Sequence, residues 1–550
     1  MKKKVCLGVA IVSLWSAGNV FAQGEIDAYK FSQSELSGTA RYMSMGGAFG
    51  ALGGDISVMG ANPAGLGIYR SSEIVTTLSV SSAKTNTDWA GTTMDESKTK
   101  FNFDNIAYVG YFPTGNDEGL VGWNVGFSYN RAMNFNRRYQ MGRGAGGYSL
   151  SDYIAAISNR DGATGNNLLS SDSYDPYMSQ NWLSVLGYDS YIISSSNPSQ
   201  AGGFYSSFGE NADNLWEVQQ ADLYVHENGA IDKYNFSLAT NISNTVFLGA
   251  TLAVTDLNYH LTSVYDEDFG YGDGQTTSDH LYWDNYSSVD GTGYAFNLGV
   301  IVRPCDFLRL GVAYNSPTWY KITDYHTAEA GATINGYTDA QGTQNVNSNV
   351  STPDGAYTEY RLRTSDRWIF SAAAILGQTA LISVDYELSR YNSMHLSAWN
   401  GYDWSGDELY DNEYIAQDFR VGSMLKVGAE IKVTPQFAVR FGGAWQNTPV
   451  NSSLLYNESD GVASLVEVST ASTRTAYTVS RNTGYATFGL GYRFTPNFYA
   501  DLACVYRIQK EDAYPFSNVF DSEGLPIVES NPASLKTSTT KVSLTLGYKF

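Results

Sequence analysis

The sequence of 550 residues contains little charge, little cysteine and no long hydrophobic run. Only 16% of its residues are charged, and 34 Lys+Arg against 55 Asp+Glu give a formal net charge of −21. The shortage of cations argues against nucleic acid as a partner, because phosphate binding requires clustered positive charge. Three cysteines are too few for a disulfide framework. No stretch reaches 18 apolar residues, so the sequence predicts no membrane-spanning helix.

Glycine and aromatic residues are plentiful instead. The chain has 54 Gly and 41 Tyr, and aromatic residues make up 14% of it. So many aromatic residues argue against disorder. The chain has little Glu or Lys and much Tyr, Ser, Asn and Gly. This composition is not typical of helical domains. The composition therefore favours a large β protein.

The first 22 residues are expected to be a secretory signal peptide. Lys2 to Lys4 are followed by a short apolar stretch at 5–15 and by a small-x-small cleavage site that ends at Ala22. The apolar stretch is too short to span a bilayer as a helix. A buried N-terminal helix is the less favoured alternative, so we expect an exported protein.

The last ten residues show the clearest strand pattern. Val542, Leu544, Leu546, Tyr548 and Phe550 fall on one face, and polar or small residues alternate with them. Strict alternation over this length is typical of one crossing of a membrane by a β-strand. An aromatic carboxyl terminus on such a strand also implies the barrel-assembly machinery as a partner.

The same alternation recurs along the chain and predicts fourteen strands. They span about 72–83, 102–112, 119–135, 230–242, 245–262, 291–303, 307–322, 361–376, 379–394, 417–433, 436–449, 481–494, 497–509 and 539–550. Short connections follow each even strand. Long connections follow each odd strand, at 84–101, 136–229, 263–290, 323–360, 395–416, 450–480 and 510–538.

An even number of strands with tight turns at one end and long loops at the other is typical of an outer-membrane barrel. We therefore predict an all-β fold, a 14-stranded antiparallel transmembrane β-barrel over 72–550, in the bacterial outer membrane. In lipid the barrel must close, because an unpaired strand edge cannot be solvated there. A soluble sandwich has no reason to keep its long loops at one end. The loop at 136–229 is the largest, and short helices are expected near 151–157 and 178–186.

Residues 23–71 precede the first strand and do not alternate. They are rich in Gly and Ala, and Met45, Phe49, Leu52, Ile56 and Met59 are spaced for packing. A fourteen-stranded barrel is wider than the eight-stranded kind that its own side chains fill. We therefore predict that 23–71 is an N-terminal hatch, or plug, rather than a flexible periplasmic tail.

The motif GGAFGALGGDISVMGANPAGL at 46–66 resembles the N-terminal hatch of the FadL/TodX family of outer-membrane transporters. Weaker resemblances occur at 293–322 and 419–450. The resemblance implies passive uptake of hydrophobic small molecules, either fatty-acid-like or aromatic. In that family the ligand is captured by extracellular loops, reaches a lumenal site beside the hatch, and leaves sideways where the third strand is kinked. Outer-membrane lipid and lipopolysaccharide would surround such a barrel.

Carried onto this chain, the resemblance gives hatch and gating candidates Asn62, Pro63, Ala64 and Gly126, the last as a kink in the third strand. Candidates for ligand contact in the predicted loops are Phe269, Tyr271, Tyr282, Trp283 and Tyr325. Arg303 and Arg440 face inward on their strands and could meet a ligand carboxylate. The alternative for these arginines is an ion-pair ladder with Asp385, Glu387, Glu430 and Asp501. The long loop at 136–229 departs from the family and leaves the ligand unidentified.

Other functions remain as alternatives. A general aqueous porin is the strongest, although porins generally lack an N-terminal hatch. Scattered His and Tyr in loops leave a haem-binding receptor open, and long acidic loops would also suit an adhesin. A calcium site at 266–274 lacks the spacing of a known calcium loop, so a solvated loop is preferred there. No Gly-x-Ser-x-Gly elbow is present, and we expect neither an enzyme nor a cofactor.

Overall fold

The computed structural model describes residues 24–208, 216–271, 276–339, 342–353, 356–399, 411–455, 467–468, 470 and 472–550. The signal peptide expected at 1–22 lies outside these residues, as does part of the calcium candidate at 266–274. In the part of the chain that the structure describes, no helix is long and apolar enough to cross a membrane.

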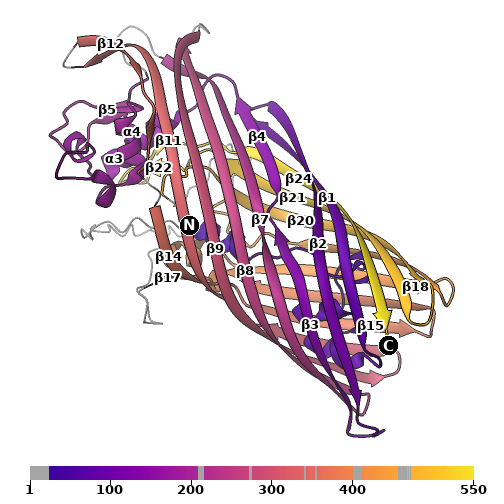
Figure 1. Ribbon diagram of the computed structural model, residues 1–550. Coiled ribbons are helices and arrows are strands. Elements are labelled where there is room, and N and C mark those ends of the chain that lie inside the picture. Colours follow the sequence, from indigo (N-terminus) through magenta and orange to yellow (C-terminus); the bar gives the residue numbers. More distant parts are fainter. Residues whose placement is uncertain are drawn as a thin grey trace, which may run out of the picture.

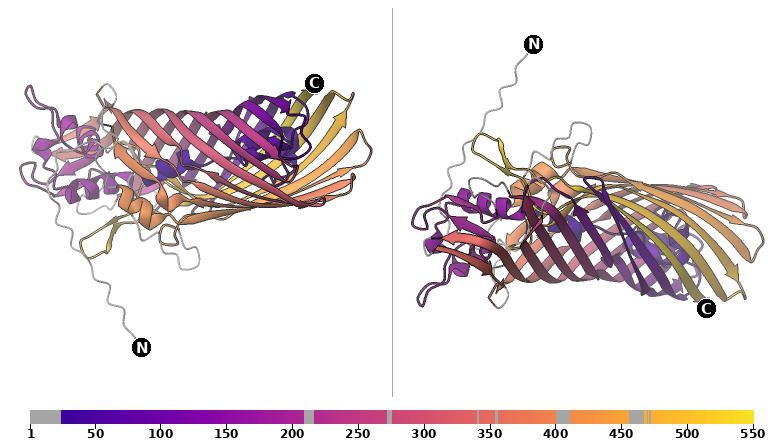
Figure 2. Two further views of the ribbon diagram at one scale, coloured as in Figure 1. Left: turned by 90° about the horizontal axis from the view of Figure 1, so that it is seen from below. Right: turned by 90° about the horizontal axis from the view of Figure 1, so that it is seen from above.

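The described strands form a closed antiparallel barrel of fourteen wall strands, several of them divided into segments (Figures 1 and 2). The wall segments are β1 (Glu73–Trp89), β2 (Thr92–Pro113), β3 (Leu120–Asn134), β4 (Arg137–Arg143), β7 (Trp216–Ile242), β8 (Val246–Tyr271), β9 (Thr276–Cys305), β10 (Leu308–Asn315), β11 (Trp319–Asp339), β14 (Ala356–Arg363), β15 (Arg367–Leu376), β16 (Ala380–Arg390), β17 (His395–Ala398), β18 (Val421–Lys432), β19 (Phe437–Gln446), β20 (Tyr477–Arg493), β21 (Phe498–Tyr514) and β24 (Ala533–Lys549).

Closure is made by the first and last strands. β1 pairs with β24 in continuous antiparallel register from Glu73↔Lys549 to Asp88↔Ser534. The fold class predicted from the sequence is therefore confirmed. Short turns join the strands at one end of the barrel, which we call the turn end. The opposite end is the loop end.

The outer face of the wall changes character along each strand. On β8, Leu248 and Leu252 point outward and are exposed, and from Asp256 onward the outward positions are mainly polar. On β9 the outward residues from Val302 to Tyr294 are apolar or aromatic, and Asp290 lies beyond them on the same face. An apolar belt of limited height around a closed barrel is the surface that hydrocarbon requires.

The strands continue past this belt toward the loop end. The prediction that 263–290 and 323–360 are long loops is wrong for most of their length, because β8 extends to Tyr271, β9 begins at Thr276 and β11 extends to Asp339. Their inward faces stay buried above the belt, as at Trp283 and Leu281. Alternation becomes hard to read there because polar residues now occupy the outward positions.

Residues 24–71, the N-terminal segment, lie inside the barrel (Figure 2). The segment contains α1 (Glu25–Ser32), α2 (Ala40–Ser44), η1 (Ile56–Gly60) and η2 (Pro63–Ile68). Side chains cap the last three at their N-termini: Thr39 accepts from Tyr42 N, Asp55 from Ser57 N, and Asn62 from Ala64 N. Such caps satisfy the free N–H groups of very short helices.

The prediction that 136–229 is one long loop is wrong at both ends, where β4 and the start of β7 continue the wall. Residues between them, up to 208, form a cap at the loop end (Figure 1). It contains α3 (Leu150–Arg160) and α4 (Trp182–Asp189), where the two short helices were expected. Glu267 of β8 is fully buried and ties the cap to the wall. Its carboxylate accepts hydrogen bonds from Leu150 N at 3.1 Å and from the hydroxyl of Tyr265 at 2.5 Å. A carboxyl group that accepts a hydrogen bond at the N-terminus of a helix also interacts favourably with the helix dipole.

The apolar belt predicts a depth-dependent response to charge. Leu298→Arg, on the lipid face of β9, should lower the free energy of unfolding by about 2–4 kcal/mol, because the guanidinium would face hydrocarbon. Ser288→Arg, on the same face but above the belt, is the matched control and should change it by less than about 0.5 kcal/mol. Urea titration in lipid vesicles measures both. Equal costs at the two positions would contradict the assigned belt.

Candidate functional site

The N-terminal segment touches the wall at glycines whose missing side chains make room for it. A Cβ added at Gly249 of β8 would lie 2.3 Å from Ala64 N, and one at Gly299 of β9 would lie 1.9 Å from Asn62 Oδ1. Asn62 is 1% exposed and donates to Gly50 O at 2.6 Å. The predicted hatch residues Asn62, Pro63 and Ala64 therefore lie against β8 and β9.

The same kind of contact continues around the barrel. An added Cβ would come within 2.3–2.4 Å of the N-terminal segment at four further wall glycines: Gly311 of β10, Gly428 of β18, Gly442 of β19 and Gly489 of β20. We call these six wall glycines the glycine ring. Distances this short leave no room for any side chain. The segment and the wall are consequently in direct contact over much of the circumference at this level.

Gly126 of β3 faces the same segment, and its added Cβ would lie 2.7 Å from Met59 Cε. The irregularities of β3 lie elsewhere. The pairing between β3 and β7 shifts register between Leu120 and Gly122 and again between Arg131 and Met133. The structure thus gives Gly126 a packing contact, and the register shifts of β3 lie on either side of it.

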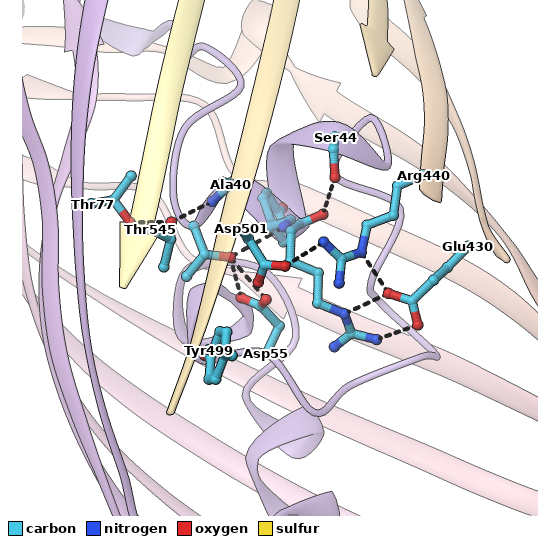
Figure 3. A network of polar contacts seen from close by, with 12 residues as sticks. Ala40, Ser44, Asp55, Thr77, Glu430, Arg440, Tyr499, Asp501 and Thr545 are labelled. Atoms are coloured by element: carbon cyan, nitrogen blue, oxygen red, sulfur yellow. Dashed lines mark hydrogen bonds and ion pairs between the residues drawn. The ribbon is translucent and has the colours of Figure 1, made fainter. Parts of the chain in front are cut away.

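Polar contacts reinforce the glycine ring toward the turn end (Figure 3). Arg440 is 6% exposed and donates to Glu430 and to Asp501, each at 2.6 Å. Arg41 of the N-terminal segment joins the same Glu430 at 2.9 Å. Ala40 N donates to Thr545 Oγ1 of β24 at 2.7 Å. Arg440, a candidate for ligand contact, is therefore held by two wall carboxylates.

A cavity of about 110 Å³, the first chamber, lies between the N-terminal segment and the wall on the loop side of the glycine ring. Its apolar lining includes Leu36, Tyr42, Ala61, Ile369 and Met424. Apolar residues with a few polar groups among them are a lining typical of sites for small organic molecules.

The first chamber carries an excess of positive charge. Glu387 pairs with Arg367 at 3.2 Å and with Lys426 at 2.7 Å, so one carboxylate serves two cations. Lys233 of β7 also lines the chamber, and no ion pair to it is found among the described residues. A ligand with one acidic group would find an unmatched ammonium here.

A second chamber of about 80 Å³ adjoins the first around Glu35, which lines both. Met133, Phe135 and Asn136, at the end of β3, form part of its wall. Glu35 N donates to Ala132 O at 3.0 Å, beside the register shift of β3. The N-terminal segment is thus attached directly to the irregular part of this strand.

The wall beside the second chamber lacks a backbone ladder. β2 and β3 pair only from Pro113↔Gly122 to Asn105↔Asn130, although β2 extends further to Thr92. Beyond that point the two edges are bridged by side chains. Asn134 donates to Asn102 Oδ1 at 3.3 Å, and Lys100 donates to Asn136 Oδ1 at 3.0 Å. We call this interruption the wall slot.

The wall slot begins at the upper edge of the apolar belt. Phe101 is 63% exposed, and Phe103 stacks on Tyr129 with ring centroids 5.7 Å apart. Further along, Lys98 Nζ lies 2.6 Å from Nε2 of His226 on β7. The slot therefore has an aromatic end that faces lipid and a polar end that faces water.

Acidic residues meet where the N-terminal segment reaches the loop end. α1 contacts α5 (Asp411–Asp418). Burial raises the pKa of Glu25 well above its usual value, and the charges of Asp411 and Asp418 raise it further. Burial likewise raises the pKa of both aspartates to about 6. Because these pKa values are raised in the folded protein, the contact is most stable at low pH and weakens as pH rises through about 6.

The aromatic candidates do not form one groove. Phe269 is buried and stacks on Phe208 at 4.2 Å, whereas Trp283 is fully buried and donates to Thr473 O. Tyr282 donates to Glu329, and Tyr325 is 37% exposed beside Tyr286. The side chain of Tyr271 lies outside the described residues. Arg303 pairs with Asp306 in the turn that follows β9, and neither residue lines a chamber.

Sequence reasoning missed Lys233, Arg367 and the slot residues. Lys233 shares the inward face of a predicted strand with Asn235 and Ser237, so the alternation could have predicted that its side chain points inward. That it stands beside a cavity depends on where the N-terminal segment leaves space. Among the described residues, no group of three His, Cys, Asp or Glu is arranged to hold a metal ion.

Comparisons with known proteins identify the fold. The structure is similar to that of a FadL homologue from Pseudomonas aeruginosa, with 14% identity, coverage of 94% of this chain and 99% of that chain, and a TM-score of 0.51. It is also similar to a deltaS2 mutant of the TodX monoaromatic hydrocarbon channel, with 12% identity, coverage of 94% and 100%, and a TM-score of 0.51.

No protein-family model and no curated protein sequence matches this chain. At 12–14% identity the likeness establishes the fold. A closed barrel of this fold with an apolar outer belt is a bacterial outer-membrane protein.

The glycine ring makes a steric prediction. Gly428→Val should displace the N-terminal segment, because its Cβ would lie 2.4 Å from Met45 O. Ion conductance of the variant in planar bilayers should rise at least tenfold over that of the unaltered protein. Gly484→Val is the matched control. Its Cβ faces outward at 3.4 Å from the ring of Trp445, so conductance should stay unchanged. A high conductance in the unaltered protein would contradict the seal.

Proposed function

We propose that the protein is an outer-membrane channel for the passive uptake of hydrophobic small molecules. The observation that carries the proposal is that two adjoining chambers lie beside a side-chain-bridged slot in the wall, on the loop side of the level where the N-terminal segment meets the glycine ring. The fold shared with the FadL homologue and with TodX, a monoaromatic hydrocarbon channel, adds support.

The route follows from these features. A hydrophobic molecule enters from the loop end, which faces outside the cell, and rests in the first chamber. The glycine ring blocks the way to the turn end, so the molecule moves past Glu35 into the second chamber. It leaves through the wall slot into the bilayer, where Phe101 and Phe103 stand at the lipid boundary. An apolar solute gains free energy on that transfer, at about 25 cal/mol per Å² of surface removed from water.

Gating is assigned to the N-terminal segment. Glu35 bonds to Ala132 O through its backbone and to Arg507 through its side chain at 3.3 Å. Movement of residues 33–35 would therefore change both the passage between the chambers and the part of β3 around its register shift at Arg131 and Met133. A ligand in the first chamber contacts the same residues, which couples occupancy to opening.

A disulfide across the wall slot tests lateral release. Asn102→Cys with Asn134→Cys, in a background of Cys305→Ser and Cys504→Ser, should lock the slot when oxidised. Transfer of radiolabelled palmitate into the membrane of proteoliposomes should fall at least tenfold and recover with reductant. The control pair is Asn258→Cys with Asp290→Cys, which joins residues already bonded at 2.7 Å on β8 and β9. Unimpaired transfer in the locked protein would exclude this exit.

Lys233 tests whether the first chamber favours an acidic ligand. Lys233→Gln should weaken palmitate binding about fivefold to tenfold, corresponding to roughly 1–1.4 kcal/mol for a lost charge-assisted contact. Binding of hexadecane, which has the same chain length and no carboxylate, should not change. Titration calorimetry in detergent measures both. Arg303→Gln, at its distant turn, is the control. Equal weakening of both ligands would show that Lys233 acts through structure alone.

A general aqueous porin is the second candidate, and the occupied bore counts against it. A haem receptor has less support. His280 stands between Asp266 and Asp268 at 3.4 and 3.0 Å, and His226 contacts Lys98, so each of these imidazoles already has a protein partner.

A further inference from the structure

The outer surface of the barrel carries a groove that the uptake route does not use. It lies over β19, β20 and β21 at the loop end and has a volume of about 580 Å³. Trp445, Leu455 and Ile508 give it apolar walls, and Gly484 forms part of its floor. Lys510 stands at its edge.

The groove begins where the apolar belt ends. On β21 the outward residues Leu502 and Tyr506 are exposed within the belt, and Ile508 and Lys510 follow on the same face. Trp445 is 53% exposed and lies in register with Gly484, which in turn lies opposite Ile508. Exposed aromatic residues at this height are typical of the membrane–water interface. The groove is therefore at the level of lipid headgroups.

Two lysines face each other beside the groove. Lys510 of β21 and Lys536 of β24 are directly opposite in the antiparallel register, and both are exposed. Like charges at such positions destabilise a sheet. The chain has 55 acidic and only 34 basic residues. Two cations directly opposite each other are therefore unusual in it, and an anion bound between them would remove their repulsion.

The acidic residues nearby are engaged elsewhere. Glu511 points inward to Arg137, and Asp512 accepts from Arg481 at 2.7 and 2.8 Å. Asp95 of β2 pairs with Lys84 of β1 at 3.2 Å. Within the described residues, neither Lys510 nor Lys536 has a carboxylate within ion-pair distance. Their charge is available to an external anion.

We propose that this groove binds a phosphorylated lipid of the outer leaflet. Lys510 and Lys536 hold a phosphate group between them, and an acyl chain packs against Trp445, Ile508 and Leu455. A phosphate placed between the two ammonium groups removes their mutual repulsion, which accounts for their opposition in register. The apolar groove directly beside the cations fits a molecule with both features, as a membrane lipid has. With the loop end outside, that lipid is a phosphorylated glycolipid of the lipopolysaccharide type.

Native mass spectrometry of the full chain in detergent tests the site, with bis-phosphorylated lipid A as the probe. Lys510→Gln combined with Lys536→Gln should reduce the bound fraction at least fivefold. Gly484→Leu keeps both cations but fills the floor of the groove, and should also reduce binding. Lys321→Gln is the matched control, since Lys321 is an exposed outer-wall cation that is already paired with Glu359 at 2.9 Å. Heat-modifiable migration in gels verifies that each variant is a folded barrel.

The outcomes separate the possible occupants. Loss of binding in both groove variants, with the control unaffected, supports the proposal. Equal binding of lipid A stripped of its phosphates would overturn it, because the lysines would then be irrelevant. Undiminished binding in the double lysine variant, or no binding by the unaltered protein, would also overturn it. A protein dimer that forms in place of the lipid adduct would assign the groove to a second copy of the chain. None of these results depends on uptake activity.

Discussion

Direct contact between the N-terminal segment and the glycines of the wall is the constraint on which the rest of this structure depends. A fourteen-stranded wall encloses a bore that its own side chains cannot fill. Here the N-terminal segment occupies the bore at one level, and the wall strands present glycine where the segment approaches. Gly249, Gly299 and Gly428 come from three different strands, yet each would place a side chain within 2.4 Å of the segment. Close approach of two chains is what the absence of a Cβ permits.

Closing the bore at the glycine ring determines where space remains. The two chambers lie on the loop side of the ring, and they meet around Glu35. Their charges are unevenly matched, since Glu387 serves both Arg367 and Lys426 while Lys233 stands apart. A ligand with an acidic group would supply the counter-charge that Lys233 lacks among the described residues. The arrangement of charge thus follows from the position of the segment.

The wall slot is the complementary feature. A barrel in lipid satisfies its backbone by continuous pairing, and β2 departs from this rule beyond Asn105. The interruption lies at the upper edge of the belt, where Asn102 and Lys100 reach across to Asn134 and Asn136. Side-chain bridges break and reform more readily than a ladder of backbone hydrogen bonds, so this part of the wall is the one most able to open.

The sequence by itself determined the number of wall strands, their order and the face that each turns to lipid. Period-two alternation with apolar outward residues carries this information, because hydrocarbon imposes it on each strand separately. The composition of 23–71 also indicated a packed segment. The alternation did not show how far β8, β9 and β11 continue past the belt, because water accepts polar residues there.

Only the tertiary structure decided which of the inward residues border open space. Arg440 and Lys233 both lie on inward faces, but Arg440 is held by Glu430 and Asp501, whereas Lys233 lines a chamber. Gly126 similarly faces Met59, and the register shifts of β3 lie on either side of it. These differences arise from contacts between strands and segments far apart in the chain. A strand's own pattern specifies its faces, and the packing of the N-terminal segment specifies what each face meets.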